Sequence, residues 1–105
     1  MITELEIERA LDFMRDNATK AAQAKANRAY MVEYRKVVKA QVMRESPGSL
    51  GSQEAEAYAS QKYIEHLQAM KAAIEQDEYL TWMMAAAEAK ISAWQTQSRN
   101  QRVNV

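Results

Sequence analysis

The sequence predicts an all-α protein: an antiparallel hairpin of two long helices, of the coiled-coil kind, completed by dimerisation. Two long segments lack Gly and Pro, and in both the apolar residues recur in steps of mostly three and four, the spacing of one helix face. Pro47, Gly48 and Gly51 lie together between these segments, where the chain is expected to reverse. The 105 residues are expected to form one domain, 1–105, and so thin a scaffold favours a homodimer.

The first long helix is predicted over about 4–45. Thr3 followed by Glu6 is the pattern of a capping box at its start. The mean step of its apolar residues is close to 3.6, which indicates a nearly straight helix rather than a strict heptad coil. The predicted buried stripe consists of Ile7, Leu11, Met14, Ala18, Ala22, Ala26, Ala29, Val32, Val37, Ala40 and Met43.

A loop is predicted over 46–52 and a second long helix over about 61–99. Residues 53–60 are expected either to form a short helix capped by Ser52, with Ser60 then the candidate cap of the long helix, or to be the start of the long helix itself. The tail 100–105 has no periodicity and is expected to fray. The predicted stripe of the second helix consists of Leu67, Met70, Ile74, Leu80, Met84, Ala87, Ile91 and Trp94.

Charge alternates along the chain in blocks, although the formal net charge is zero. Residues 1–17 sum to −3, residues 18–44 to +6, residues 45–80 to −5 and the remainder to +2. In an antiparallel hairpin the basic block meets an acidic one, so the pattern favours this orientation, although each exposed pair contributes little.

The basic block has two interpretations that the sequence leaves open. Its charges are neutralised within the hairpin, or they form a surface for nucleic acid, whose phosphates bind basic side chains and whose bases stack on aromatic rings. The candidate contacts for nucleic acid or another partner are Lys25, Arg28, Tyr30, Tyr34, Arg35 and Lys39. Tyr79, Trp82 and Met83 lie off the main stripe and are candidates for self-association.

Catalytic chemistry finds no support in the residue pattern. His66 is the only histidine and has no carboxylate three or four positions away, and there is no cysteine. No phosphate-binding loop or metal-ligand motif occurs, so we expect a non-enzymatic protein without cofactor or metal. The acidic N-terminus predicts that there is no signal peptide, and the absence of a long apolar run predicts that there is no membrane span. A cytoplasmic location is expected.

Two stretches carry a resemblance to known proteins. Residues 9–43, which include AYMVEYRK, and residues 63–97, which include AKISAWQTQ, resemble a group of small, mostly uncharacterised phage and prophage proteins encoded among early DNA-metabolism and recombination genes. Those relatives often have a proline near the start of the second long helix, where this chain has Ser60 and Gln61. The resemblance implies no catalytic residue.

The resemblance implies a phage protein of the host-cell cytoplasm, and two functions remain open. One is an accessory or adaptor that binds a protein partner of phage or host in DNA metabolism or recombination, with nucleic acid as a further contact. The other is an inhibitor of a host defence or recombination enzyme.

Overall fold

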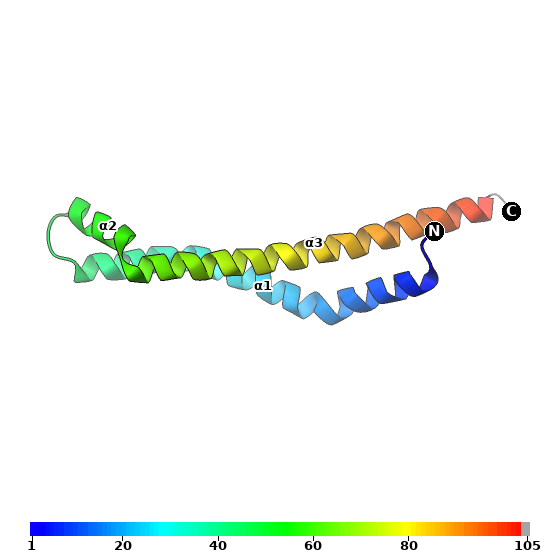
Figure 1. The fold of residues 1–105 in the computed structure, drawn as a ribbon, viewed down its shortest axis with the longest axis horizontal. Helices are drawn as coiled ribbons and strands as arrows, with labels where there is room; N and C mark the ends of the chain where they lie inside the picture. Colours follow the sequence, from blue (N-terminus) through cyan, green and yellow to red (C-terminus); the bar gives the residue numbers. More distant parts are fainter. Residues whose placement is uncertain (104–105) are drawn as a thin grey trace. The chain divides into compact units, whose positions relative to one another are not determined.

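The computed structural model describes residues 1–103, and this part of the chain is all-helical, with no strand. In chain order, α1 covers Glu4–Glu45, α2 covers Leu50–Ala59 and α3 covers Gln61–Val103, as labelled in Figure 1. The predicted all-α class is confirmed for these residues, and α1 has the bounds expected from the sequence.

The chain forms two compact units, and α1 and α3 contribute to both. Of the described residues, the terminal unit contains 1–22 and 78–103, and the central unit contains Gln23–Asp77. In the terminal unit the backbone of Ile2 and the side-chain amide of Gln97 exchange hydrogen bonds of 3.1 and 3.0 Å.

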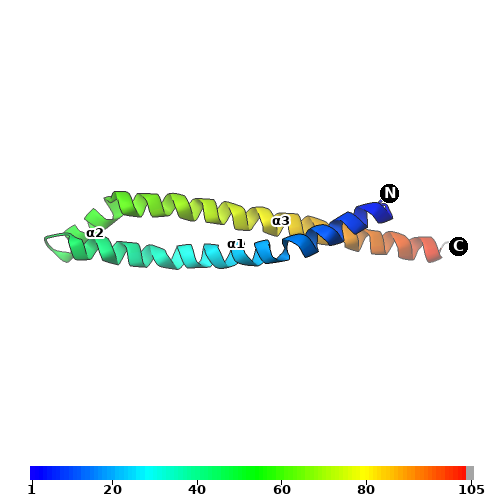
Figure 2. The same cartoon turned by 90° about the horizontal axis from the view of Figure 1, so that it is seen from below.

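Within the central unit the segments of α1 and α3 run in opposite directions. Near the middle of α1, the backbone carbonyl of Met31 lies 2.7 Å from the ring of His66 in α3. Further along α1, the Glu45 carboxylate lies 4.0 Å from the ammonium group of Lys62, a residue that precedes His66 in α3. In both views α2 lies beside the last turns of α1 (Figures 1 and 2), as the 3.5 Å ion pair between Lys39 and Glu54 requires.

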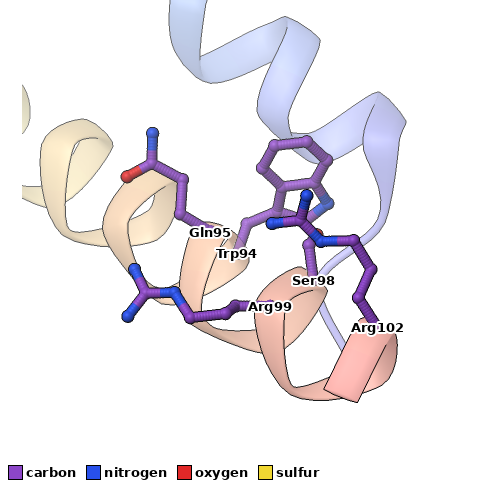
Figure 3. A pocket seen from close by; sticks show the side chains of 5 residues that line it. All are labelled: Trp94, Gln95, Ser98, Arg99 and Arg102. Carbon is purple, nitrogen blue, oxygen red and sulfur yellow. The ribbon is translucent and has the colours of Figure 1, made fainter. Parts of the chain in front are cut away.

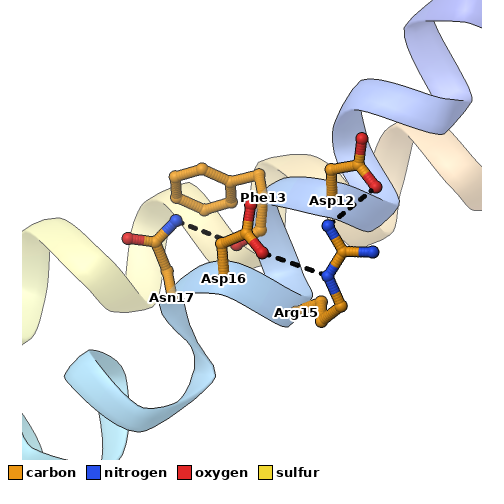
Figure 4. A network of polar contacts seen from close by, with 5 residues as sticks. All are labelled: Asp12, Phe13, Arg15, Asp16 and Asn17. Carbon is orange, nitrogen blue, oxygen red and sulfur yellow. Dashed lines mark hydrogen bonds and ion pairs between the residues drawn. The ribbon is translucent and has the colours of Figure 1, made fainter.

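The start of α1 is the capping box that the sequence predicts. The Glu6 amide donates to the Thr3 hydroxyl at 3.2 Å, and the Thr3 amide donates to the Glu6 carboxylate at 3.0 Å. Further along, Arg15 pairs on the helix surface with Asp12 and Asp16 at 3.2 and 3.0 Å (Figure 4). Pairs this exposed contribute little to stability, because water screens the two charges.

The loop is shorter than predicted because Ser49, rather than Ser52, caps α2. The Ser49 hydroxyl accepts from the Ser52 amide at 3.2 Å, which allows the helix to begin at Leu50. Gly48 has φ +102°, a conformation that favours glycine, and makes the reversal possible. Residues 46–49 are therefore the turn, and Gly51 lies inside α2.

Ser60 separates α2 from α3, which settles the two alternatives for residues 53–60. Its backbone is extended at φ −72° and ψ 150°, and its hydroxyl donates to the Ala57 carbonyl at 2.7 Å. The same hydroxyl accepts from the Tyr63 amide at 3.2 Å and so caps the next helix, as predicted. At its other end α3 continues to Val103, so the tail expected to fray from residue 100 is helical over 100–103; residues 104–105 lie outside the described residues.

The buried stripe of α1 follows strict steps of three and four, a 3.5-residue spacing rather than the predicted 3.6. Every buried residue of α1 belongs to it, and the predicted Leu11 and Val37 are 52% and 42% exposed. The predicted alanines 18, 22, 26, 29 and 40 are exposed as well. The stripe consists of Ile7, Ala10, Met14, Asn17, Ala21, Ala24, Arg28, Met31, Arg35, Val38 and Val42.

The stripe of α3 has the same spacing and agrees better with the prediction. Six of the eight predicted members lie in it, whereas Leu67 is 38% exposed and Ile74 lies beside it. The stripe consists of Tyr63, His66, Met70, Ala73, Asp77, Leu80, Met84, Ala87, Ile91, Trp94 and Ser98. Polar residues at several of these positions explain why an apolar pattern alone placed the first half of the stripe wrongly.

Candidate interaction surfaces

The buried carboxylate of Asp77 pairs with Lys25 and Arg28, two of the basic residues predicted to contact nucleic acid or another partner. Its carboxylate lies 3.3 Å from the Arg28 guanidinium and 3.5 Å from the Lys25 ammonium group. The Asp77 side chain is only 9% exposed, whereas those of Arg28 and Lys25 are 37% and 63% exposed. Two candidate cations for nucleic acid therefore face a carboxylate of their own unit.

Lys39 is also paired within the central unit. Its ammonium group lies 3.5 Å from the Glu54 carboxylate and 4.7 Å from the centre of the Tyr58 ring. The Tyr58 hydroxyl, followed by the Glu54 carboxylate, raises the pKa of Lys39 above its ordinary value. Arg35, by contrast, is partly buried in the α1 stripe, and no carboxylate within residues 1–103 pairs with it.

The predicted tyrosines lie together but differ in exposure. The rings of Tyr30 and Tyr34 stack with their centres 5.5 Å apart, and Tyr34 also lies 5.8 Å from the His66 ring. Tyr30 is 62% exposed, whereas Tyr34 is partly buried. The ring of Tyr30 is therefore accessible to a partner, whereas most of the predicted cations are paired with carboxylates.

A second apolar face lies on α3 in the terminal unit, away from the buried stripe. Tyr79, Trp82 and Met83, the predicted self-association residues, are 59%, 70% and 38% exposed. Three exposed alanines that the prediction missed continue the same side of the helix: Ala86, Ala89 and Ala93. These alanines follow Met83 in steps of three and four residues, and this spacing is the sequence pattern from which the extended face could have been predicted.

A shallow groove of about 400 Å³ borders this face in the terminal unit. Met83 and Ala86 belong to both the face and the groove, and Phe13 of α1 lines the opposite side. Its lining is mostly apolar but includes three charged residues: Glu6, Arg9, Ala10, Phe13, Met83, Ala86, Ala87 and Lys90.

An open pocket of about 610 Å³ lies on the last turns of α3. Figure 3 shows the Arg102 side chain reaching back toward the Trp94 ring, with Arg99 on the adjacent side of the helix. Gln95 and Ser98 also line it, and among the described residues no carboxylate does. This composition attracts anions, but no side chain in it is a nucleophile paired with a base.

Within residues 1–103 there is no group of three or more His, Cys, Asp or Glu side chains placed to hold a metal ion. No helix of the described chain is long and apolar enough to cross a membrane. The chain matches no protein-family model, and no curated protein or solved structure is significantly similar to it. The support for the candidate surfaces therefore comes from the structure of this chain and not from related proteins.

Proposed function

We propose that the protein is a non-enzymatic helical adaptor that acts by protein–protein contact and functions as a homodimer. In this proposal α1 and α3 continue from one unit to the other as a single antiparallel hairpin. The observation that carries it is the exposed face of α3 at Tyr79, Trp82 and Met83, because large apolar side chains at a surface are typical of an interaction site.

The exposed area of the chain supports association with another polypeptide. The chain exposes 7689 Å² at a mass of 12.0 kDa, whereas a compact monomer of this mass exposes about 6,000 Å². The excess is larger than the roughly 800 Å² that each partner loses in a standard stable interface. Among the described residues, no large side chain is less than 2% exposed, so the single chain has a thin core.

The biological setting that we propose comes from the resemblance of residues 9–43 and 63–97 to phage and prophage proteins. It is an accessory role in phage DNA metabolism or recombination, in the cytoplasm of the infected cell. Nucleic acid is a weaker candidate than a protein partner, because Lys25, Arg28 and Lys39 pair with carboxylates of the central unit.

The test combines the mass in solution with capture of the partner. Light scattering during gel filtration should give twice the 12.0 kDa chain mass at micromolar concentration. A tagged chain recovered from infected cells, with and without nuclease, should retain a phage recombination protein after nuclease treatment. A cooperatively folded monomer would contradict the dimer, and nuclease-resistant recovery of a host defence enzyme instead would support an inhibitor.

A further inference from the structure

The exposed face of α3 is divided by side-chain size. Its large residues, Tyr79, Trp82 and Met83, lie in one helical turn, and the small residues Ala86, Ala89 and Ala93 follow toward the C-terminus. Such a face has a bulky half and a flat half. An identical face fits it only when the bulky half of each copy lies against the flat half of the other.

We propose that two copies of this chain pack α3 against α3 in antiparallel orientation, about a two-fold axis beside Ala86. This rests on the homodimer proposed above and specifies its interface. In the antiparallel arrangement Ala86 faces its own copy, Trp82 faces Ala89, and Tyr79 faces Ala93. A two-fold interface is isologous, so each of these large-to-small contacts occurs twice.

The alternative parallel arrangement fits poorly for a physical reason. It would place Trp82 against Trp82 and hold the helices apart at that turn, which would leave a gap beside the alanines. The antiparallel arrangement instead allows the close approach that alanine permits and fills the space with the rings from the other copy. Lys90 then lies beside Met83 of the other copy, where its aliphatic stem covers apolar surface and its ammonium group stays in water.

The absence of cysteine from the sequence makes a direct test available. Three single variants place a thiol at exposed alanines of the same helix: Ala86→Cys, Ala93→Cys and Ala85→Cys. Under mild oxidation of the full chain, Ala86→Cys should form a disulfide-linked dimer. Ala93→Cys should not, because a two-fold axis at residue 86 separates the two copies of residue 93 by about 21 Å along the helix axis.

Ala85→Cys is the matched control, because it is exposed and adjacent to Ala86 but lies about 100° around the helix. Equal crosslinking of the thiols at 85 and 86 would overturn the proposed face. Crosslinking at both 86 and 93 would indicate a parallel pair and overturn the orientation.

Light scattering on each reduced variant distinguishes the two proposals. A dimer that fails to crosslink at 86 contradicts only the interface described here, whereas a folded monomer contradicts the dimer itself. As an independent measure, Trp82→Ala should weaken dimerisation by roughly tenfold or more while circular dichroism shows unchanged helicity. Unchanged dimerisation of Trp82→Ala would also overturn the proposed interface.

Discussion

The carboxylate of Asp77 in α3 lies 3.3 Å from the guanidinium of Arg28 in α1, and both residues occupy the 3.5-residue stripes of their helices. Asp77 is the one charged residue among those that are buried in the described chain. A buried carboxylate is tolerated where cations compensate it, and Lys25 at 3.5 Å supplies a second positive charge. The contact therefore favours one register of α1 against α3 in the central unit.

Removing the Asp77 carboxylate should destabilise the protein more than removing a surface charge. For Asp77→Ala we expect a loss of about 1–3 kcal/mol in the free energy of unfolding, measured by urea denaturation with circular dichroism. Arg15→Ala is the control, because Arg15 pairs with the exposed Asp12 and Asp16, and the free energy of unfolding should be nearly unchanged in this variant. Equal losses in the two variants would contradict a role for Asp77 in setting the register.

The pairing of the basic residues also predicts how the protein behaves with DNA. Because three of the four candidate cations already pair with Asp77 or Glu54, we expect no mobility shift of labelled DNA at about 50 mM salt and tens of micromolar protein. A free basic surface with four phosphate contacts would instead give sequence-tolerant binding with a log–log salt slope of about −3 to −4. In that case Arg35→Ala would reduce the slope by about one contact.

The two glycines around the start of α2 provide a matched pair of substitutions. Gly48→Ala should cost about 1–2 kcal/mol, because φ +102° is strained for alanine and the added methyl carbon would lie 3.3 Å from the Ser52 hydroxyl. Gly51→Ala should stabilise the protein by about 0.4–1 kcal/mol, because Gly51 is helical and its Cβ would meet open space. Thermal melts of both variants measure the difference, and effects of the same sign would refute this description of the turn.

The sequence was sufficient to predict where the helices lie, because their limits depend on local chemistry. The capping pair of Thr3 and Glu6, the helix-breaking Pro47 and Gly48, and the hydroxyl of Ser60 all act within a few residues. One local error was the cap of α2, since either Ser49 or Ser52 could cap a helix and only the geometry of the turn selects one. The other was the end of α3, which continues to Val103 rather than ending near residue 99.

The buried face was harder to predict, because alanine carries little information about burial. In α1 alanines occupy both the stripe, at Ala21 and Ala24, and the exposed side, at Ala22 and Ala26. The polar member Arg28 looks like a solvent residue until its partner Asp77, 49 positions away, is known. The α3 stripe was predicted better from Leu80 to Trp94, where all of its members are apolar.

Two adjacent valines in α1 test the corrected face directly. Val38 is 7% exposed and belongs to the 3.5-residue stripe, whereas Val37, which the sequence pattern favoured, is 42% exposed. Val38→Ala should reduce the free energy of unfolding by about 1–2 kcal/mol, because it removes buried methyl groups and leaves a small cavity. Val37→Ala, the same chemical change one position earlier, should have an effect within about 0.5 kcal/mol. Urea denaturation of the two variants under identical conditions gives the comparison, and a larger loss for Val37→Ala would restore the 3.6-residue stripe predicted from the sequence.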